Sequence, residues 1–167
     1  MDKPHYQKKN SATHSKTQNQ NRCLQINLQH SRSATFNLMK VIEKEEPDLI
    51  FVQEPYEYQN KPVGIEKKYR IFAAGKGKHR AAIVISNNKI DAILITQISD
   101  GDTVFIEIIH ENMKFSAASM YFDTEDQTEK NSKKINALLQ FAKGGRTLIA
   151  TDSNSRSTTW HDTLTNT

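Results

Sequence analysis

The chain has 167 residues, which is enough for one domain with a substantial core. Its 25% charged and 36% hydrophobic residues are ordinary for a folded protein, which excludes disorder along the whole chain, and no apolar run approaches membrane-spanning length. The single cysteine, Cys23, excludes an internal disulfide and a cysteine-based metal cluster.

The formal net charge of +4 comes entirely from residues 1–22, because residues 23–167 are neutral in sum. Residues 1–22 have almost no aliphatic side chains, so we predict a disordered basic tail there. Two interpretations stay open: a sliding contact to nucleic acid, or a leader without a binding role. The sequence pI of about 9.1 therefore does not mark residues 23–167 as a basic nucleic-acid clamp.

Alternation over Cys23–Leu28 predicts a strand that ends in the polar residues from Asn27 onward. Ser33 is a good N-cap for a following helix, which Pro47 ends. The expected apolar face of that helix consists of Phe36, Met39 and Ile42. Leu49–Val52 then forms an unbroken apolar run, typical of a strand covered on both faces. Strand, helix and strand in this order predict a βαβ unit with two parallel strands.

Glu54 is the candidate functional residue of the second strand. The apolar run ends at Gln53 and Glu54, and Pro55 prevents further ladder pairing. A carboxylate at the end of a buried strand can hold a hard cation such as Mg²⁺, while phosphate and water complete its shell. The alternative interpretation is a surface glutamate in a turn. The stretch 152–154, which also places acid and amide side chains after an apolar strand, favours the functional interpretation.

A polar loop is expected over residues 57–69, followed by a short strand over 69–74. The basic turn after it predicts a hairpin connection rather than a phosphate loop, because no helix follows. Its side chains Lys76, Lys78 and Arg80 are candidates for contacts to a nucleic-acid backbone. Four further strands are then expected as one antiparallel meander, at residues 81–86, 92–98, 103–109 and 113–120.

A second helix is predicted after Thr124, with Gly144 as its C-cap. Its expected apolar stripe consists of Ile135, Leu138, Leu139 and Ala142. A strand over 147–150 then leads into the stretch that contains Asp152 and Asn154. These elements together predict an α/β protein.

Several of these stretches resemble motifs of the exonuclease-endonuclease-phosphatase superfamily, and they occur in the family's order. They are Leu24–Asn27, Asp48–Glu54, Ser119–Tyr121 and Thr151–Asn154. Gln53–Tyr56, Arg80–Ile83 and Asp152–Trp160 resemble more narrowly the apurinic-type endonuclease domains of non-long-terminal-repeat retrotransposons. The resemblance implies a two-sheet α/β sandwich with helices outside.

The resemblance also implies roles for five residues. Glu54 would bind Mg²⁺, with Mn²⁺ as a substitute, and Asn27 would assist the placement of metal or phosphate. Tyr121 would lie at the scissile phosphate, and Asp152 would orient or deprotonate the attacking water. Asn154 would donate to the phosphoryl oxygen. Nucleic-acid contacts are expected from Arg32, Lys76, Lys78, Arg80 and Arg156. His30 does not match a family motif and is interpreted as a loop histidine.

The family has a further Asp-containing strand and a final Asp-His pair beyond the motifs present here. We therefore expect residues 23–167 to cover the first, larger part of an endonuclease domain, with an incomplete second sheet and little activity. The implied function is Mg²⁺-dependent nicking of target DNA to prime reverse transcription. DNA would be the partner, a parent polyprotein with reverse transcriptase is expected, and the location would be intracellular and nuclear. The alternatives are a retroelement-derived fragment that binds nucleic acid without cutting it and a phosphatase on the same fold.

Overall fold

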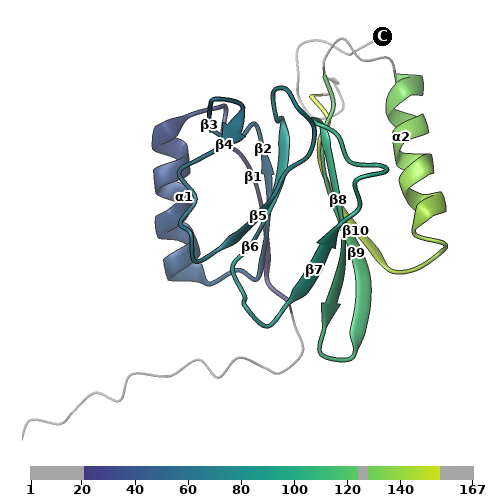
Figure 1. The fold of residues 1–167 in the computed structure, drawn as a ribbon, viewed down its shortest axis with the longest axis horizontal. Helices are drawn as coiled ribbons and strands as arrows, with labels where there is room; N and C mark the ends of the chain where they lie inside the picture. Colours follow the sequence, from purple (N-terminus) through teal and green to yellow (C-terminus); the bar gives the residue numbers. More distant parts are fainter. Residues whose placement is uncertain (1–20, 124–127, 155–167) are drawn as a thin grey trace, which may run out of the picture.

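A computed structural model describes residues 21–123 and 128–154 as a four-layer α/β/β/α sandwich (Figure 1). Helix α1 (Arg32–Glu45) covers the outer face of one sheet, and helix α2 (Thr128–Phe141) covers the outer face of the other. The two sheets pack face to face between them. The fold expected from the sequence is therefore confirmed.

The first sheet has the strand order β1-β2-β6-β5. Its strands are β1 (Cys23–Asn27), β2 (Leu49–Gln53), β6 (Ala81–Ile85) and β5 (Arg70–Phe72). β1 and β2 are parallel and joined through α1, with Asn27 opposite Gln53, which confirms the predicted βαβ unit. A small hairpin of β3 (Glu57–Tyr58) and β4 (Lys61–Pro62) occupies the region predicted as a polar loop.

The second sheet has the strand order β10-β9-β8-β7. Its strands are β7 (Asp91–Leu94), β8 (Thr103–His110), β9 (Met113–Tyr121) and β10 (Thr147–Asp152). β7, β8 and β9 form an antiparallel meander, whereas β10 runs parallel to β9 after the crossover through α2. The predicted four-strand meander is wrong in one respect, because β6 pairs with β2 and β5 in the first sheet.

Three apolar clusters hold the layers together. The cluster between the sheets contains Leu49, Phe51, Ile83 and Ile106, and α1 packs on the first sheet through Leu38 and Ile42. On the other side, α2 packs on the second sheet through Leu138. Every residue of β2 is buried, as its unbroken apolar run predicted.

Two details of α1 differ from the sequence-based expectation. Its N-cap is Ser31 rather than Ser33, because the Ser31 side chain accepts a hydrogen bond from the Ala34 backbone at 3.2 Å. Its buried face comprises Thr35, Leu38, Met39 and Ile42. Phe36, which was expected in the core, is 62% exposed. The prediction is therefore confirmed for Met39 and Ile42 and wrong for Phe36, whose place on the buried face is taken by Thr35 and Leu38.

Residue Thr124, the expected N-cap of α2, lies outside the described residues. Leu138 is 2% exposed as predicted, whereas Leu139 is 46% exposed and lies at the edge of the α2 stripe. Neither α1 nor α2, the helices of the described part of the chain, combines the length and apolarity needed to cross a membrane.

Candidate active site

The carboxyl ends of β1, β2, β9 and β10 meet at one end of the sandwich. β1 and β2 end side by side in the first sheet, with Asn27 paired to Gln53. β9 and β10 end side by side in the second, with Tyr121 paired to Asp152. A hydrogen bond from Asn27 Nδ2 to Asp152 Oδ2, at 2.5 Å, joins the two strand ends across the sheets. The sequence motifs that ended these strands therefore converge in space.

Asp152 accepts hydrogen bonds on both carboxylate oxygens. Oδ2 accepts from Asn27, and Oδ1 accepts from the Asn154 backbone at 3.2 Å. Asn27 is oriented in turn by the Gln29 backbone, which donates to its Oδ1 at 2.7 Å. Donors to both oxygens of a carboxylate fix its direction. The arrangement gives a partly exposed, preoriented carboxylate, which suits a group that must hold a water molecule.

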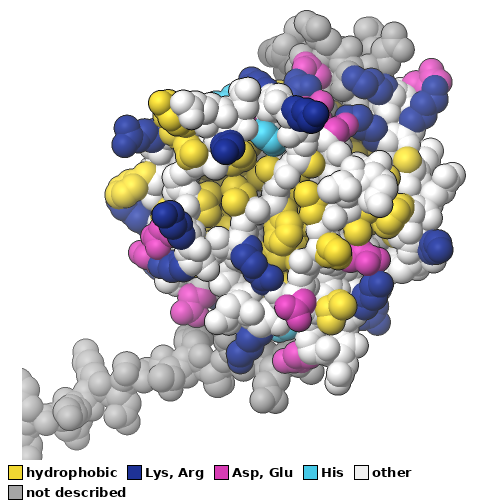
Figure 2. Space-filling model, viewed as in Figure 1, with side chains coloured by type: hydrophobic (Ala, Val, Ile, Leu, Met, Phe, Trp, Pro, Cys, Tyr) yellow, Lys and Arg dark blue, Asp and Glu magenta, His cyan; other side chains and the backbone are white. Residues whose placement is uncertain are grey.

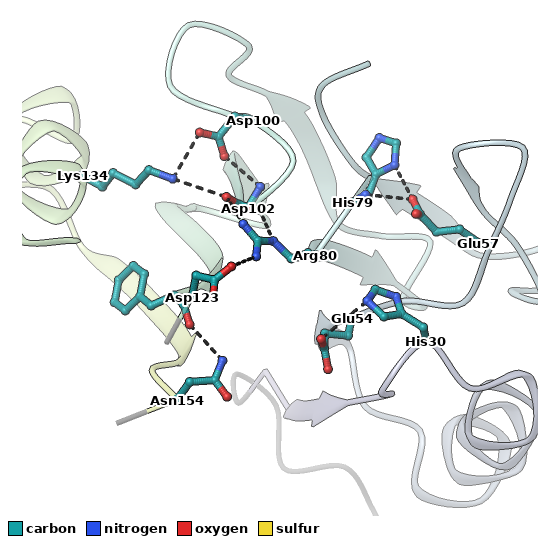
Figure 3. Close-up of polar contacts among 11 residues, drawn as sticks. His30, Glu54, Glu57, His79, Arg80, Asp100, Asp102, Asp123, Lys134 and Asn154 are labelled. Atoms are coloured by element: carbon teal, nitrogen blue, oxygen red, sulfur yellow. Dashed lines mark hydrogen bonds and ion pairs between the residues drawn. The ribbon is translucent and has the colours of Figure 1, made fainter. Parts of the chain in front are cut away.

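Glu54 lies immediately after β2 with a left-handed backbone, φ 47°. That conformation is uncommon for a residue with a Cβ. It is held by hydrogen bonds from the Glu54 nitrogen to Arg80 O at 2.9 Å and from the His30 nitrogen to Glu54 O at 2.8 Å. The Glu54 side chain is 20% exposed, points toward His30 (Figure 3) and lies near enough to Tyr121 for its charge to act on that hydroxyl. The turn therefore aims a partly buried carboxylate at the same rim as Asp152.

His30 is a site residue that the sequence analysis missed. Its Nε2 lies 3.5 Å from Glu54 Oε1, and its Nδ1 lies 2.9 Å from the Pro55 carbonyl oxygen. Because a carbonyl only accepts, Nδ1 carries the proton. The other ring nitrogen, Nε2, is buried and faces Glu54 without a hydrogen bond among the described residues. The signal that could have found His30 is its position three residues after Asn27 in the loop that leaves β1.

Tyr121 ends β9 at the same rim. Burial raises the pKa of its hydroxyl above the ordinary value, the negative charge of Glu54 raises it further, and a hydrogen bond with Asn154 opposes the shift. The Tyr121 hydroxyl is therefore protonated at neutral pH and can donate. Asn154 itself is oriented by donation from its Nδ2 to the Phe122 carbonyl at 2.9 Å (Figure 3).

Arg80 was predicted to contact a nucleic-acid backbone, but in the structure acidic partners surround it. Its Nε and Nη2 donate to the two carboxylate oxygens of Asp102 at 2.7 and 2.8 Å, and its Nη1 donates to Asp123. Hydrogen bonds to Asp102, then Asp123, raise the pKa of Arg80 above its ordinary value, against the opposing effect of burial. The Arg80 guanidinium also stacks 4.8 Å from the centre of the Tyr121 ring. Arg80 therefore clamps the two sheets and supports Tyr121.

The remaining predicted nucleic-acid contacts are spread around this end of the molecule. Lys76 and Lys78 are exposed in the turn before β6, and Arg32 is exposed at the first position of α1. Arg156 lies outside the described residues. The predicted hairpin role of residues 75–80 is confirmed by the antiparallel pairing of β5 with β6.

A buried polar contact joins the sheets directly beneath the rim. Gln53 and Ser119 are each 0% exposed, and Gln53 Nε2 donates to Ser119 Oγ at 3.0 Å. The Ser119 hydroxyl donates in turn to the Val52 carbonyl at 3.2 Å. This contact lies one residue before Glu54 and two before Tyr121, so it fixes how the two strand ends face each other.

The carboxylates at the rim are hard oxygen ligands of the kind that magnesium prefers. Within residues 21–123 and 128–154, no three His, Cys, Asp or Glu side chains gather closely enough to form a metal cage. Mg²⁺ is commonly held by one or two carboxylates, with waters and substrate phosphate as the other ligands. Glu54 supplies one such carboxylate. Asn27 uses both of its polar groups to hold Asp152 and Gln29, so its structural role here is to orient Asp152.

Comparison with solved structures identifies the fold. The chain superimposes on the endonuclease domain of TRAS1, a telomere-specific non-LTR retrotransposon, with a TM-score of 0.72 and 23% identity over 83% of this chain. It covers 61% of that chain's length. No protein-family model and no curated protein matches the sequence.

Three further structures, of two proteins, match with lower TM-scores over a similar part of this chain. D. rerio TDP2 matches in a humanized form, with a TM-score of 0.60 and 17% identity over 81% of this chain and 63% of that one. It also matches in a complex with single strand DNA product, with a TM-score of 0.53 and 15% identity over 81% and 60%. An endonuclease/exonuclease/phosphatase family protein from Leptotrichia buccalis matches with a TM-score of 0.55 and 15% identity over 79% and 66%. The chain therefore has the exonuclease-endonuclease-phosphatase fold.

Proposed function

We propose that this chain is the larger part of a Mg²⁺-dependent endonuclease domain of a non-LTR retrotransposon, which hydrolyses a phosphodiester of target DNA. The observation that carries the proposal is the hydrogen bond between Asn27 and Asp152. It gathers strand ends that are far apart in sequence into one polar rim, where Glu54 and Tyr121 also lie. The likeness to the TRAS1 endonuclease domain supports the retrotransposon assignment, and the TDP2 complex with single strand DNA product supports DNA as the substrate.

Phosphodiester hydrolysis needs an activated water and stabilisation of the charge that builds on the phosphoryl oxygens. Asp152, preoriented by Asn27 and Asn154, is suited to hold the water and accept its proton. The protonated Tyr121 hydroxyl and the Asn154 amide are donors suited to the phosphoryl oxygens. Mg²⁺, when bound at Glu54, would supply electrophilic stabilisation of the phosphate.

The test combines nicking with metal binding. Because little activity is expected of residues 23–167, nicking of supercoiled plasmid should be slow in Mg²⁺ and absent in a chelator. Glu54→Gln and Asp152→Asn should each lower the rate on the order of a hundredfold to a thousandfold, the usual cost of removing one transition-state group. Glu111→Gln, an exposed change in the turn between β8 and β9, is the matched control and should leave nicking unchanged.

Binding of Mn²⁺, followed by electron paramagnetic resonance, gives a second readout that does not depend on activity. Glu54→Gln should weaken Mn²⁺ binding, whereas Glu111→Gln should not. Nicking in a chelator, or Mn²⁺ binding that Glu54→Gln leaves unchanged, would overturn the proposed mechanism. DNA binding without any nicking would instead favour the alternative of a non-catalytic nucleic-acid-binding fragment.

A further inference from the structure

An aromatic groove lies between α1 and the β3–β4 hairpin, beside the candidate active site. Its volume is about 430 Å³. Its lining includes Arg32, Phe36, Tyr56, Tyr58, Val63 and Gly64. Figure 2 shows hydrophobic side chains next to Lys and Arg side chains along this edge of the molecule, over α1 and the hairpin.

Two aromatic side chains of the groove are largely exposed to solvent. Tyr58 is 64% and Phe36 is 62% exposed, the highest values among the large hydrophobic side chains of the described residues. The core face of α1 is already filled by Leu38, Met39 and Ile42. Phe36 therefore presents its ring to solvent without a role in the core.

The charge around the groove is positive. None of the residues that line the groove is acidic, and the lining residue Arg32 is exposed. The ammonium of Lys40 lies 4.7 Å from the centre of the Phe36 ring, and the exposed Lys61 is paired with Tyr58 across the hairpin. Aromatic faces combined with cations form the usual platform for unpaired nucleotides, whose bases stack while their phosphates pair with the cations.

The groove is fixed in place by backbone contacts, and the chain connects it to the rim. Tyr56 follows Glu54 by two residues, and the Tyr56 carbonyl accepts from the Val63 backbone at 3.0 Å. Gly64 approaches α1 so closely that a Cβ there would lie 2.9 Å from Thr35 Cγ2, and its φ of +87° also favours glycine. Tyr56 therefore lines the groove only two residues along the chain from Glu54 at the rim.

We propose that the aromatic groove binds an unpaired base of the DNA strand, next to the phosphate held at the rim. This inference rests on the proposed endonuclease function and adds to it a preference for single-stranded or unstacked DNA. An intact duplex offers its phosphates at the surface but keeps its bases stacked inside. Only an unpaired or extruded base can reach the rings of Phe36 and Tyr58.

The test measures the binding of a short fluorescent oligo-dT strand by anisotropy, in a chelator so that no cutting occurs. Phe36→Ala and Tyr58→Ala should each weaken binding about tenfold, within the range known for base–aromatic stacking. Ile93→Ala, which removes a 61% exposed side chain from β7, is the matched control and should have no effect. A strand of the same length with abasic sugars should bind the wild type more weakly than oligo-dT does. It should bind the wild type and Phe36→Ala with equal affinity.

The contribution of Arg32, the cation that lines the groove, is tested separately. Arg32→Gln should lower the salt dependence of binding by about 0.7 in the log–log slope for single strands. Arg146→Gln changes an exposed arginine before β10 and should not alter the slope. Circular dichroism spectra that match the wild type would show that the variants are folded.

Each outcome decides between the two proposals. Unchanged oligo-dT binding in Phe36→Ala, or an equal loss on base-bearing and abasic strands, would overturn the groove inference and leave the nicking results standing. A groove that serves a peptide partner would also give unchanged DNA binding. The opposite combination is also informative. If Phe36→Ala weakens binding only of strands that carry bases, while Glu54→Gln leaves Mn²⁺ binding unchanged, the groove inference would be supported and the endonuclease mechanism refuted.

Discussion

The buried contact between Gln53 and Ser119 offers a sharp test of how the two sheets are held beneath the candidate site. Ser119→Ala removes the acceptor of Gln53 Nε2, which is 3.0 Å away and has no access to water. A buried donor left without its partner costs about 1–3 kcal/mol. The change also deletes the hydrogen bond from Ser119 to the Val52 carbonyl. We therefore expect a loss of about 2 kcal/mol in the free energy of unfolding.

The double variant separates this cost from simple loss of side-chain contacts. Gln53→Leu keeps a similar volume without a polar group, and Ser119 can still donate to Val52 in that variant. When both residues are changed, no unsatisfied side-chain donor remains at the contact. The double variant should therefore be less destabilised than the sum of the single variants, by about 1 kcal/mol, within the range for coupled neighbours.

Urea unfolding followed by circular dichroism measures these differences, provided that all four proteins unfold with the same denaturant slope. The reasoning would fail if Ser119→Ala cost less than about 0.5 kcal/mol, or if the two changes were additive within that limit. Either result would mean that water or a rearranged side chain satisfies Gln53, and that the contact does not set the spacing of the sheets.

Three further predictions concern charge. The raised pKa of Tyr121 means that the folded state binds the hydroxyl proton more tightly than the unfolded state does. The free energy of unfolding should therefore fall as pH rises above the ordinary value of 10.0. The tyrosinate absorbance that disappears in Tyr121→Phe should titrate above that pH. Arg80→Lys cannot reproduce the bidentate pair with Asp102 and should lower unfolding free energy by about 1 kcal/mol in urea. Deleting the basic tail, residues 1–22, should weaken duplex DNA binding and reduce its salt slope by about 0.9 per lost phosphate contact, whereas an unchanged slope would identify this segment as a leader.

Local sequence patterns were sufficient for the elements that carry the site. The unbroken run Leu49–Val52 predicted a strand buried on both faces, and β2 is fully buried. Pro55 and the polar residues at 27 and 152–154 marked where strands end, and those ends do meet. Such patterns succeed because the period of side-chain burial and the loss of a backbone donor at proline are properties of a few consecutive residues.

What the sequence by itself determined was thus the βαβ unit and the polar strand ends that meet at the rim, whereas it missed the β3–β4 hairpin and extended the strand at 91–94 to residue 98. The tertiary structure alone decided that β6 joins the first sheet, that Arg80 faces two carboxylates, and that His30 lies against Glu54. It also decided that Phe36 faces solvent rather than the core. These facts depend on which distant segments pair and which side of a helix meets the sheet. Periodicity reveals that a face exists, but the partner of that face is set by packing between residues far apart in the chain.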